Sequence, residues 1–363
     1  MRIAVIGSRG IPNHYGGFEE CAAQLSRRWV NNGHEVVVYN SSLHPYNGSS
    51  WEGVELRRMS DPEDRLGTFG QFIYDLNCIR DCRKSGFDII LQLGYTSSGV
   101  WQFLLPSGSK IITNMDGLEW KRSKYNFLVR RFLRWSEQLA ARAAHQMVAD
   151  NTGILDYLDR SYGKGSVYIP YGAEVPEKAS SELLRSYGLE SGKYDLLMAR
   201  MEPENNIQMI LEGLVASDSE LPVLVVGHKP NAYGLQLQQR FEGTQVRFHP
   251  GIFERAHTDA LRQGCRSYFH GHSVGGTNPS LLEAMACGCL IHAHDNPFNR
   301  NVLDTNAHYF SSASDIKDQM ARPLVATEMA LWKKDNLERL RREFQWESIA
   351  EQYLLLFEQL SIR

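Results

Sequence analysis

The feature that most constrains the fold of this chain is a regular alternation of short apolar runs with longer amphipathic segments. Short apolar runs predict buried strands, and apolar residues repeated at helical spacing predict helices. Such alternation is typical of a parallel sheet covered by helices. In the first half, strands are predicted at 2–6, 34–39, 88–92, 110–114, 146–149 and 166–169, and helices at about 18–32, 68–85, 124–144 and 151–160.

The pattern then starts again. Strands are predicted near 194–199, 222–226, 245–248, 267–270 and 289–293, and helices near 204–215, 233–242, 254–263 and 279–287. Between the halves, segment 169–176 contains two prolines and a glycine, which interrupt regular structure. A chain of 363 residues suits two domains. We therefore predict an α/β chain with two Rossmann-like domains facing each other across a cleft, 1–170 and 171–345, and a helix in 346–363 that crosses back to the first domain.

Composition narrows the class of protein. The formal net charge is −3, which does not favour a general attraction to nucleic acid. The six cysteines form no CxxC pair and no zinc-finger spacing, so we expect reduced, structural cysteines. We expect a cytoplasmic protein, because no secretion signal and no apolar run of about 20 residues is visible; peripheral contact with the inner face of the plasma membrane stays open.

The first candidate motif is the loop from Gly7 to Gly17, which follows the first predicted strand and holds four glycines. Glycines allow sharp turns, and a helix N-terminus offers unpaired N–H groups to an anion or a sugar. The alternative is a plain strand-to-helix turn. The G-x-G-x-x-G spacing is absent, which argues against a nicotinamide oxidoreductase. The candidate ligands are Gly16 and Gly17 for a donor, and Asn13, His14 and Tyr15 for an acceptor.

The second motif runs from Gly271 to Ala286, where a strand leads through a glycine-rich loop into a helix that begins near Pro279. Backbone N–H groups at such a helix start, together with the helix dipole, are suited to a phosphate. Glu283, one turn into the helix, is placed to bond a ribose. Alternatively, the glycines only form a tight turn and Glu283 is a solvated charge. The residues predicted to bind the donor here are Gly275, Gly276, Thr277, Asn278, Pro279, Ser280 and Glu283.

Two further segments follow predicted strands. Arg200 lies just after a strand and is a bidentate donor suited to phosphate oxygens; the alternative is an ion pair with Glu202 or Glu204. Asp116 follows the 110–114 strand and is a candidate to orient the acceptor hydroxyl or take its proton, or else only caps the next turn. Glu119 is a weaker candidate for the same role.

These segments resemble the donor-site signature of glycosyltransferase family 4, whose members have the GT-B fold. Glu283 matches the second of two glutamates that stand eight positions apart, and Gly275 occupies the place of the first. Arg200 matches the arginine that contacts the donor diphosphate, and Asn205 stands where relatives have a lysine. The missing carboxylate at position 275 indicates a different, less hydroxylated donor sugar.

The Gly7–Gly17 loop, segment 116–122 and the Gly-Gly-Thr-Asn-Pro-Ser form of the donor loop resemble bacterial capsule and exopolysaccharide rhamnosyltransferases, over nearly the whole chain. The resemblance implies a retaining hexosyltransferase in bacterial surface polysaccharide synthesis that needs no metal. Its donor would be dTDP-L-rhamnose and its acceptor a saccharide, carried on a polyprenyl diphosphate. The catalytic candidates are Asp116, Arg200 and Glu283. A UDP- or GDP-hexose donor, or a non-catalytic nucleotide-sugar-binding protein, are the alternatives.

Segment 120–135 contains six basic residues and no acidic one, with aromatic residues between them. A helix of this kind presents a basic face beside an aromatic one, as helices at membrane surfaces do. The alternative is an ordinary amphipathic helix packed on the sheet. Nucleic-acid binding is discounted, because no nucleic-acid-binding motif accompanies the segment.

Overall fold

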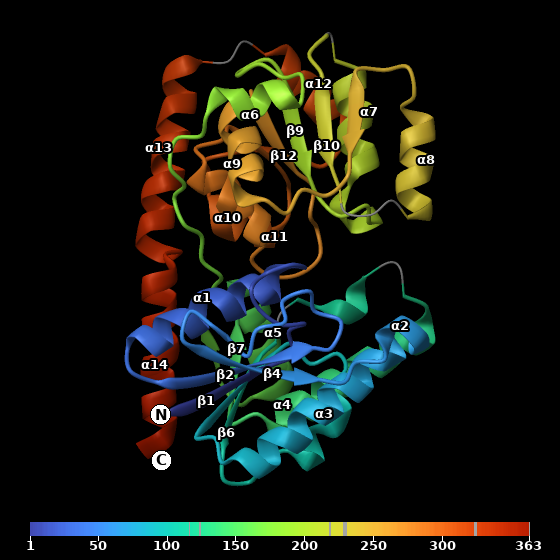
Figure 1. Ribbon diagram of the computed structural model, residues 1–363. Helices are drawn as coiled ribbons and strands as arrows, with labels where there is room; N and C mark the ends of the chain where they lie inside the picture. The colour runs from blue at the N-terminus through green and yellow to red at the C-terminus, as the bar shows by residue number, and fades with distance from the viewer. Residues whose placement is uncertain (116, 123–124, 218, 228–230, 323–324, 363) are drawn as a thin grey trace. The chain divides into compact units, whose positions relative to one another are not determined.

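A computed structural model describes residues 1–115, 117–122, 125–217, 219–227, 231–322 and 325–362. The chain forms two compact units. The first comprises Met1–Tyr171 together with Trp346–Arg363, and the second comprises Gly172–Gln345. Each unit contains one sheet flanked by helices (Figure 1).

The sheet of the first unit has eight strands in the order β3-β4-β2-β1-β5-β6-β7-β8. All neighbouring strands are parallel except β3 and β4, which are antiparallel. The strands are β1 Arg2–Ile6, β2 Glu35–Ser41, β3 Ser50–Trp51, β4 Val54–Met59, β5 Ile89–Leu93, β6 Lys110–Asn114, β7 Gln146–Ala149 and β8 Ser166–Tyr168.

The central strands of this sheet are buried on both faces, as their continuous apolar sequences require. On one face, α3 packs its residues Tyr74, Cys78 and Ile79 against β1, β2, β5 and β6. The helices are α1 Gly17–Asn31, α2 Glu63–Leu66, α3 Phe69–Ser85, α4 Phe127–Ala143, α5 Thr152–Tyr162 and α14 Trp346–Ile362, with short 3-10 helices η1 Gly99–Leu104 and η2 Glu119–Lys121.

The C-terminal helix α14 is an integral part of the first unit, where it lies beside α1 (Figure 1). The buried indole of Trp29 in α1 donates a hydrogen bond to the carbonyl of Ala350 at 3.0 Å. The Trp29 ring also contacts the rings of Tyr353 and Phe357, with centroids 6.0 and 5.2 Å apart. The last helix therefore fills the core on the face of the sheet that α1 covers.

Replacing Phe357 by Ala should lower the free energy of unfolding by about 3–5 kcal/mol, because a buried aromatic ring is exchanged for a cavity against Trp29. Leu355→Ala, on the exposed side of the same helix, should change it by less than about 0.5 kcal/mol. Chemical denaturation measures both. Equal effects of the two substitutions would contradict the packing of α14.

The second unit contains a fully parallel six-stranded sheet in the order β11-β10-β9-β12-β13-β14. Its strands are β9 Asp195–Met198, β10 Val223–Val226, β11 Val246–His249, β12 Ser267–His270, β13 Ile291–His294 and β14 His308–Phe310. Its helices are α6 Ser181–Ser186, η3 Pro203–Asn205, α7 Ile207–Val215, α8 Ala232–Arg240, α9 Arg255–Gly264, α10 Pro279–Ala286, α11 Pro297–Leu303, α12 Ala313–Ala321 and α13 Ala326–Glu343.

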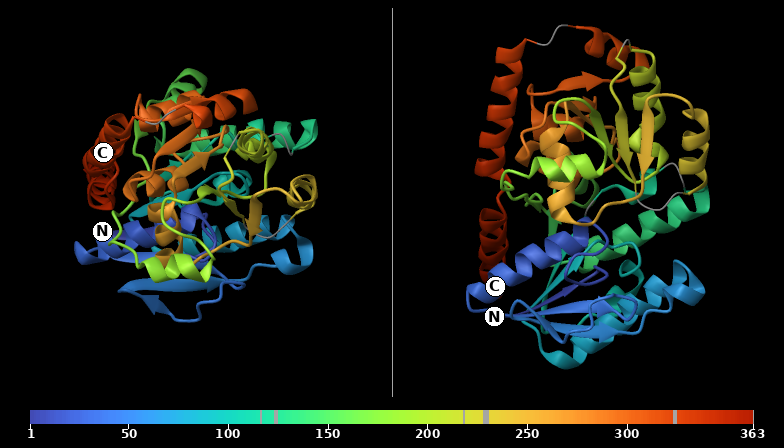
Figure 2. Two further views of the ribbon diagram at one scale, coloured as in Figure 1. Left: turned by 90° about the horizontal axis from the view of Figure 1, so that it is seen from above. Right: turned by 45° about the horizontal axis from the view of Figure 1, so that its top comes forward.

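The core of the second unit on one face of the sheet is built by α7, α8 and α12. Ile210 and Leu214 of α7 and Ile316 of α12 pack there against Phe269 and Phe310 of the strands. On the outer side of the unit, the long helix α13 packs against α10 (Figure 2). The described helices include none that is long and apolar enough to cross a membrane.

The predicted strands and helices lie within a few residues of the observed ones, and five kinds of element were not predicted. They are the edge pair β3 and β4, the three-residue strand β14, the 3-10 helices η1 and η2, the short helices α2, α6 and α11, and the helices α12 and α13. In α13 only Asn336 and Leu340 are buried, so its sequence shows little apolar periodicity. In β4, polar residues alternate with apolar ones, and half of the strand faces outward.

Candidate active site

The candidate donor loop joins β12 to α10 in the second unit. Asn278 is the N-cap of α10, and its side-chain oxygen accepts a hydrogen bond from the Ser280 N–H at 2.9 Å. Pro279 occupies the first helical turn, as predicted from its position. Gly275 has a φ of 107°, which side-chain-bearing residues rarely adopt. The loop conformation therefore disfavours a glutamate at position 275.

Glu283 of α10 forms an ion pair with Arg262 of α9, which is buried. The Arg262 guanidinium also donates to the hydroxyl of Ser280 at 3.2 Å, and that hydroxyl lies 2.7 Å from the hydroxyl of Tyr268. Burial lowers the pKa of Arg262, but the adjacent Glu283 carboxylate raises it and the net shift is upward. Arg262 therefore stays charged and holds Glu283 beside the start of α10.

Arg262 was not among the predicted site residues. The available signal is a charged side chain on the buried side of an amphipathic helix, next to Ala260 and Leu261. Buried charges are normally paired, so such a position predicts a nearby acidic partner. The identity of the partner, 21 positions further along the chain, is visible only in the folded protein.

Arg200 and Asn205 lie after β9, the strand next to β12. Arg200 is exposed, and its guanidinium makes no ion pair with the side chains that the structure describes, Glu202 and Glu204 included. Asn205 is buried; its amide donates to the carbonyl of Arg200 at 2.8 Å, and its oxygen lies 2.9 Å from Nδ1 of His272. Asn205 thus connects the Arg200 turn to the donor loop.

More bonds join the same two segments. The amide of Asn206 donates to the carbonyl of Gly271 at 2.8 Å, and Ser273 donates to the carbonyl of Glu204 through both its N–H and its hydroxyl. A Cβ on Gly271 would lie 1.9 Å from the carbonyl oxygen of Asn205, so only glycine fits there. The structure therefore brings the Arg200 turn and the donor loop together at the carboxyl end of the sheet.

His270, the last residue of β12, is buried in this region and was not predicted as part of it. Burial, and next the neighbouring His272, lower the pKa of His270 to about 3. The imidazole is therefore neutral, and its Nε2 has no hydrogen-bond partner within the described part of the chain.

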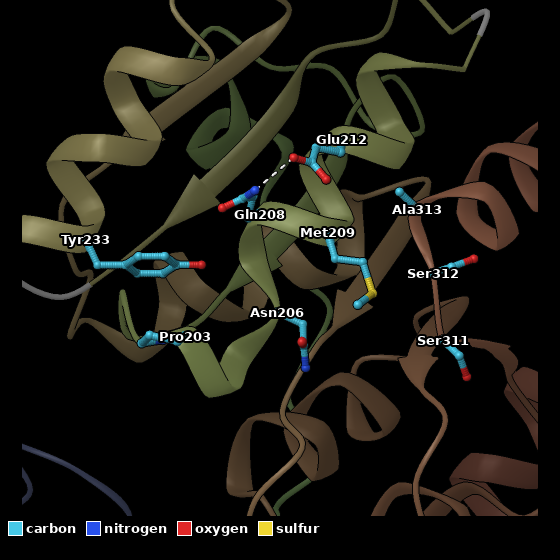
Figure 3. Close-up of a pocket in the computed structure, with 9 residues that line it drawn as sticks. All are labelled: Pro203, Asn206, Gln208, Met209, Glu212, Tyr233, Ser311, Ser312 and Ala313. Atoms are coloured by element: carbon cyan, nitrogen blue, oxygen red, sulfur yellow. Dashed lines mark hydrogen bonds between the residues drawn. The ribbon is translucent and has the colours of Figure 1, made fainter. Parts of the chain in front are cut away.

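A pocket of about 430 Å³ lies next to η3 on the α7 side (Figure 3). In it, the Gln208 amide donates to the Glu212 carboxylate at 2.9 Å. Its lining residues are Pro203, Asn206, Gln208, Met209, Glu212, Tyr233, Ser311, Ser312 and Ala313. None of the predicted donor-binding residues lines this pocket.

In the first unit, side chains outside the Gly7–Gly17 loop hold the loop in place. The Asn40 side chain makes two hydrogen bonds, at 3.0 and 2.8 Å, with the backbone of Ile11. Arg9 pairs with Glu63, and its guanidinium lies 4.3 Å from the centre of the Tyr15 ring. The loop is therefore held by residues that the sequence analysis did not select.

The three predicted acceptor residues of this loop, Asn13, His14 and Tyr15, are exposed. The Asn13 amide donates to Glu20 at 3.0 Å, and its oxygen accepts from the Tyr15 N–H at 3.1 Å. Gly16 is the N-cap of α1, and Gly17 begins that helix. The loop thus presents polar and aromatic side chains at a helix N-terminus.

The predicted residue Asp116 lies outside the described residues. Glu119 forms an ion pair with Arg122 at 2.5 Å, and both side chains are largely buried. This pairing engages the Glu119 carboxylate with a residue of its own turn.

The turn at 117–121 is anchored by Glu137 of α4, which is buried. The Glu137 carboxylate accepts hydrogen bonds from the indole of Trp120 at 3.1 Å and from the hydroxyls of Tyr95, Tyr157 and Tyr162 at 2.8, 2.6 and 2.6 Å. Burial, and next the hydrogen bond to Glu137, raise the pKa of Tyr157 to about 12. Sequence reasoning missed this cluster because its members lie on four separate segments.

A double-mutant cycle tests the connection between the two donor segments. Asn205→Ala and His272→Ala should each destabilise the protein, and their coupling energy should be about 0.5–1.5 kcal/mol, the usual contribution of one hydrogen bond. Urea unfolding of the wild type, both single variants and the double variant gives the four free energies. Purely additive effects would contradict the hydrogen bond.

Comparison with known proteins adds three findings. The family described as a domain of unknown function (DUF1972) matches residues 1–174. No curated protein matches the chain in sequence. Solved structures match it over nearly its full length.

Sucrose-phosphate synthase from Thermosynechococcus elongatus is 18% identical, with a TM-score of 0.79 over 99% of this chain and 98% of its own. HepE from Anabaena, in complex with UDP-glucose, is 13% identical, with a TM-score of 0.78 over 98% and 99% of the two chains. The α,α-trehalose-phosphate synthase (UDP-forming) from Burkholderia xenovorans, in complex with glucose-6-phosphate, is 11% identical, with a TM-score of 0.75 over 99% and 100%. At these identities the matches establish the fold, and the predicted GT-B fold with two parallel-sheet domains is confirmed.

Proposed function

We propose that this protein is a glycosyltransferase that uses a nucleotide-sugar donor. The observation that carries the proposal is the match along 98–99% of the chain to sugar-transferring proteins of the GT-B fold. The second unit supports it independently, because Arg200 and a capped helix N-terminus lie at the same end of one sheet. Helix N-termini and arginine side chains are both suited to phosphate groups.

In this proposal the donor diphosphate binds at the start of α10. The Ser280 N–H is already used by the Asn278 cap, so the contacts come from the preceding amides of Gly276 and Thr277 and from the Arg200 guanidinium. These groups stabilise the leaving diphosphate as its charge develops, so we propose transfer without a metal ion. Chelation by EDTA should therefore leave the rate unchanged. We also propose retention of configuration, which the family resemblance implies.

Glu283 is proposed to bond the ribose while Arg262 orients its carboxylate. Asn205 is proposed to position the donor site without touching the donor, because its side chain bonds the Arg200 carbonyl and His272. The diphosphate is then contacted by Arg200.

For the sugar, we propose L-rhamnose from dTDP-L-rhamnose. The support is the resemblance of the donor loop and the backbone at Gly275, which disfavours the carboxylate that relatives direct at the donor. A UDP-hexose is the second candidate, because the similar HepE structure contains UDP-glucose. A GDP-hexose is the third, and a binding protein without catalysis is the alternative to all three.

For the acceptor, we propose a saccharide carried on a polyprenyl diphosphate in bacterial surface polysaccharide synthesis, bound by the first unit. The exposed side chains of Asn13, His14 and Tyr15 provide hydrogen-bonding groups and an aromatic ring for a sugar. Asp116 is proposed to orient the acceptor hydroxyl, with the Glu119 turn held in place by Glu137 through Trp120.

A panel of nucleotides and nucleotide sugars, measured by thermal shift, tests the donor assignment, because ligands that bind only the folded state raise its Tm. We expect the largest shift with dTDP and dTDP-L-rhamnose. A shift only with UDP or GDP compounds would overturn the sugar and keep the reaction. No shift with any compound would contradict the proposed function, and binding without transfer or donor hydrolysis would favour the non-catalytic alternative.

Arg200→Ala should weaken donor binding about 10- to 150-fold, corresponding to the loss of a charge-assisted hydrogen bond of about 1.5–3 kcal/mol. Its unliganded Tm should not change, since Arg200 is exposed. Arg185→Ala, another exposed arginine of the same unit, is the control and should bind donor normally. Calorimetric titration measures the affinities; normal donor affinity in Arg200→Ala would remove Arg200 from the site.

A further inference from the structure

Three elements of the first unit pack side by side: α3, η1 and α4. Figure 1 labels α3 and α4 on the same side of the sheet. The η1 helix contacts both of the others. The Trp101 indole donates to the carbonyl of Phe72 in α3 at 2.8 Å, and Ser136 of α4 donates to the carbonyl of Tyr95 just before η1. The outer side of these three elements is therefore one continuous surface.

Aromatic rings run across this outer side from α3 to α4. Successive ring centroids lie 5.9 Å apart from Phe69 to Phe72, 5.8 Å from Phe72 to Phe132 and 5.9 Å from Phe132 to Trp135. Several large apolar side chains here are exposed: Phe69 63%, Phe103 75%, Leu128 74% and Trp135 49%. We call the set Phe69, Phe72, Phe103, Leu128, Phe132 and Trp135 the aromatic surface.

Contiguous exposed apolar side chains of this kind mark an interaction site, whereas single ones are ordinary. The segment 120–135 indicated only part of it. Trp120 instead bonds to the buried Glu137, and the Arg122 side chain is largely buried against Glu119. The additional members lie on α3 and η1, which the sequence analysis did not connect with α4.

The charge of the three elements that carry the aromatic surface is positive. The described residues of the three elements include three carboxylates: Asp75 and Glu137 are buried, and Asp81 pairs with Arg57 of β4. The basic residues of the same elements are Arg80, Arg83, Lys84, Arg130, Arg131, Arg134 and Arg142. Arg131 and Arg134 are exposed on α4, the helix that carries Leu128, Phe132 and Trp135, and the Arg134 guanidinium lies 5.3 Å from the centre of the Trp120 ring. This charge contrasts with the net charge of −3 for the whole chain.

We infer that the aromatic surface docks on an anionic lipid bilayer. Aromatic and aliphatic side chains enter the boundary between headgroups and acyl chains, while neighbouring arginines pair with the anionic headgroups. Charge complementarity selects this occupant, since the described part of the three elements presents basic side chains and no accessible unpaired carboxylate. The inference goes beyond the proposed transfer reaction and is tested without donor or acceptor.

The test is co-sedimentation of the full-length protein with vesicles of phosphatidylcholine, with and without phosphatidylglycerol. We expect binding to the anionic vesicles that weakens as salt is raised, and much weaker binding to the neutral ones. Arg131→Gln with Arg134→Gln should reduce the partition coefficient roughly 30-fold, at about 1 kcal/mol per basic residue. Phe103→Ser with Trp135→Ser should reduce it by at least about tenfold, through the loss of inserted apolar area.

Control variants lose exposed apolar or charged side chains in the second unit instead. Leu235→Ser with Leu331→Ser removes two exposed apolar side chains from the second unit, and Lys317→Gln removes an exposed charge there. Both should bind vesicles like the wild type. Thermal melting verifies that every variant is folded. All of the substituted positions are exposed, so none of the substitutions should unfold the protein.

Two results would overturn the inference. One is a vesicle assay in which the wild type does not bind anionic vesicles, or in which the surface variants bind them as well as the wild type does. The other is a concentration-dependent dimer, seen by light scattering, that the Phe103→Ser, Trp135→Ser variant abolishes without any effect of lipid; the surface would then be an interface between two copies of the chain.

Discussion

The hydrogen bonds between the turn after β9 and the loop after β12 hold the candidate donor site together. They join segments separated by about 65 positions in the chain: Asn205 with His272, Asn206 with Gly271, and Ser273 with Glu204. Parallel neighbouring strands end at the same edge of a sheet, which brings these segments near one another, but strand pairing alone leaves loop positions undetermined. Side-chain amides and hydroxyls complete the placement, and the two polypeptide backbones come into contact at Gly271.

This arrangement gives a physical meaning to the two departures from the glycosyltransferase family 4 signature that the sequence resembles. A lysine at position 205 would have to carry a charge at a buried position and would lose both bonds that Asn205 makes. A glutamate at position 275 would have to adopt a φ of 107°. Asn205 thus contributes hydrogen bonds between the two turns where the signature has a charge, and Gly275 contributes a backbone conformation that a glutamate rarely adopts.

The sequence was sufficient for the central strands of the two sheets. Strands such as β1, β5 and β10 are largely apolar because both of their faces are buried, and this pattern is readable without a structure. Strand β14 has only three residues, and in β4 the consecutive Arg57 and Arg58 interrupt the alternation of polar and apolar residues, so neither strand was predicted. Motifs with glycine and proline identified the donor loop for a similar reason, because local backbone geometry restricts those residue types.

The buried polar contacts within each of the two units could not be predicted from the sequence. Arg262, Glu137 and His270 are buried polar residues in two helices and a strand that also contain other polar residues, so the sequence does not single them out. Their roles come from partners on other segments: Glu283 for Arg262, and Tyr95, Tyr157 and Tyr162 for Glu137. The spacing of residues along one segment carries no information about contacts with other segments. The predicted residue Asp116 lies outside the described residues, so its role stays a prediction.

The Glu137 cluster also affects which substitutions the first unit tolerates. A carboxylate has room for about four hydrogen bonds, and here all are supplied, by one indole and three phenols from separate segments. Because Trp120 is held in this way, an exposed position of the same turn such as Lys121 contributes little to the stability of the unit. Substitutions at such exposed positions can therefore change what the turn contacts without disturbing the packing beneath it.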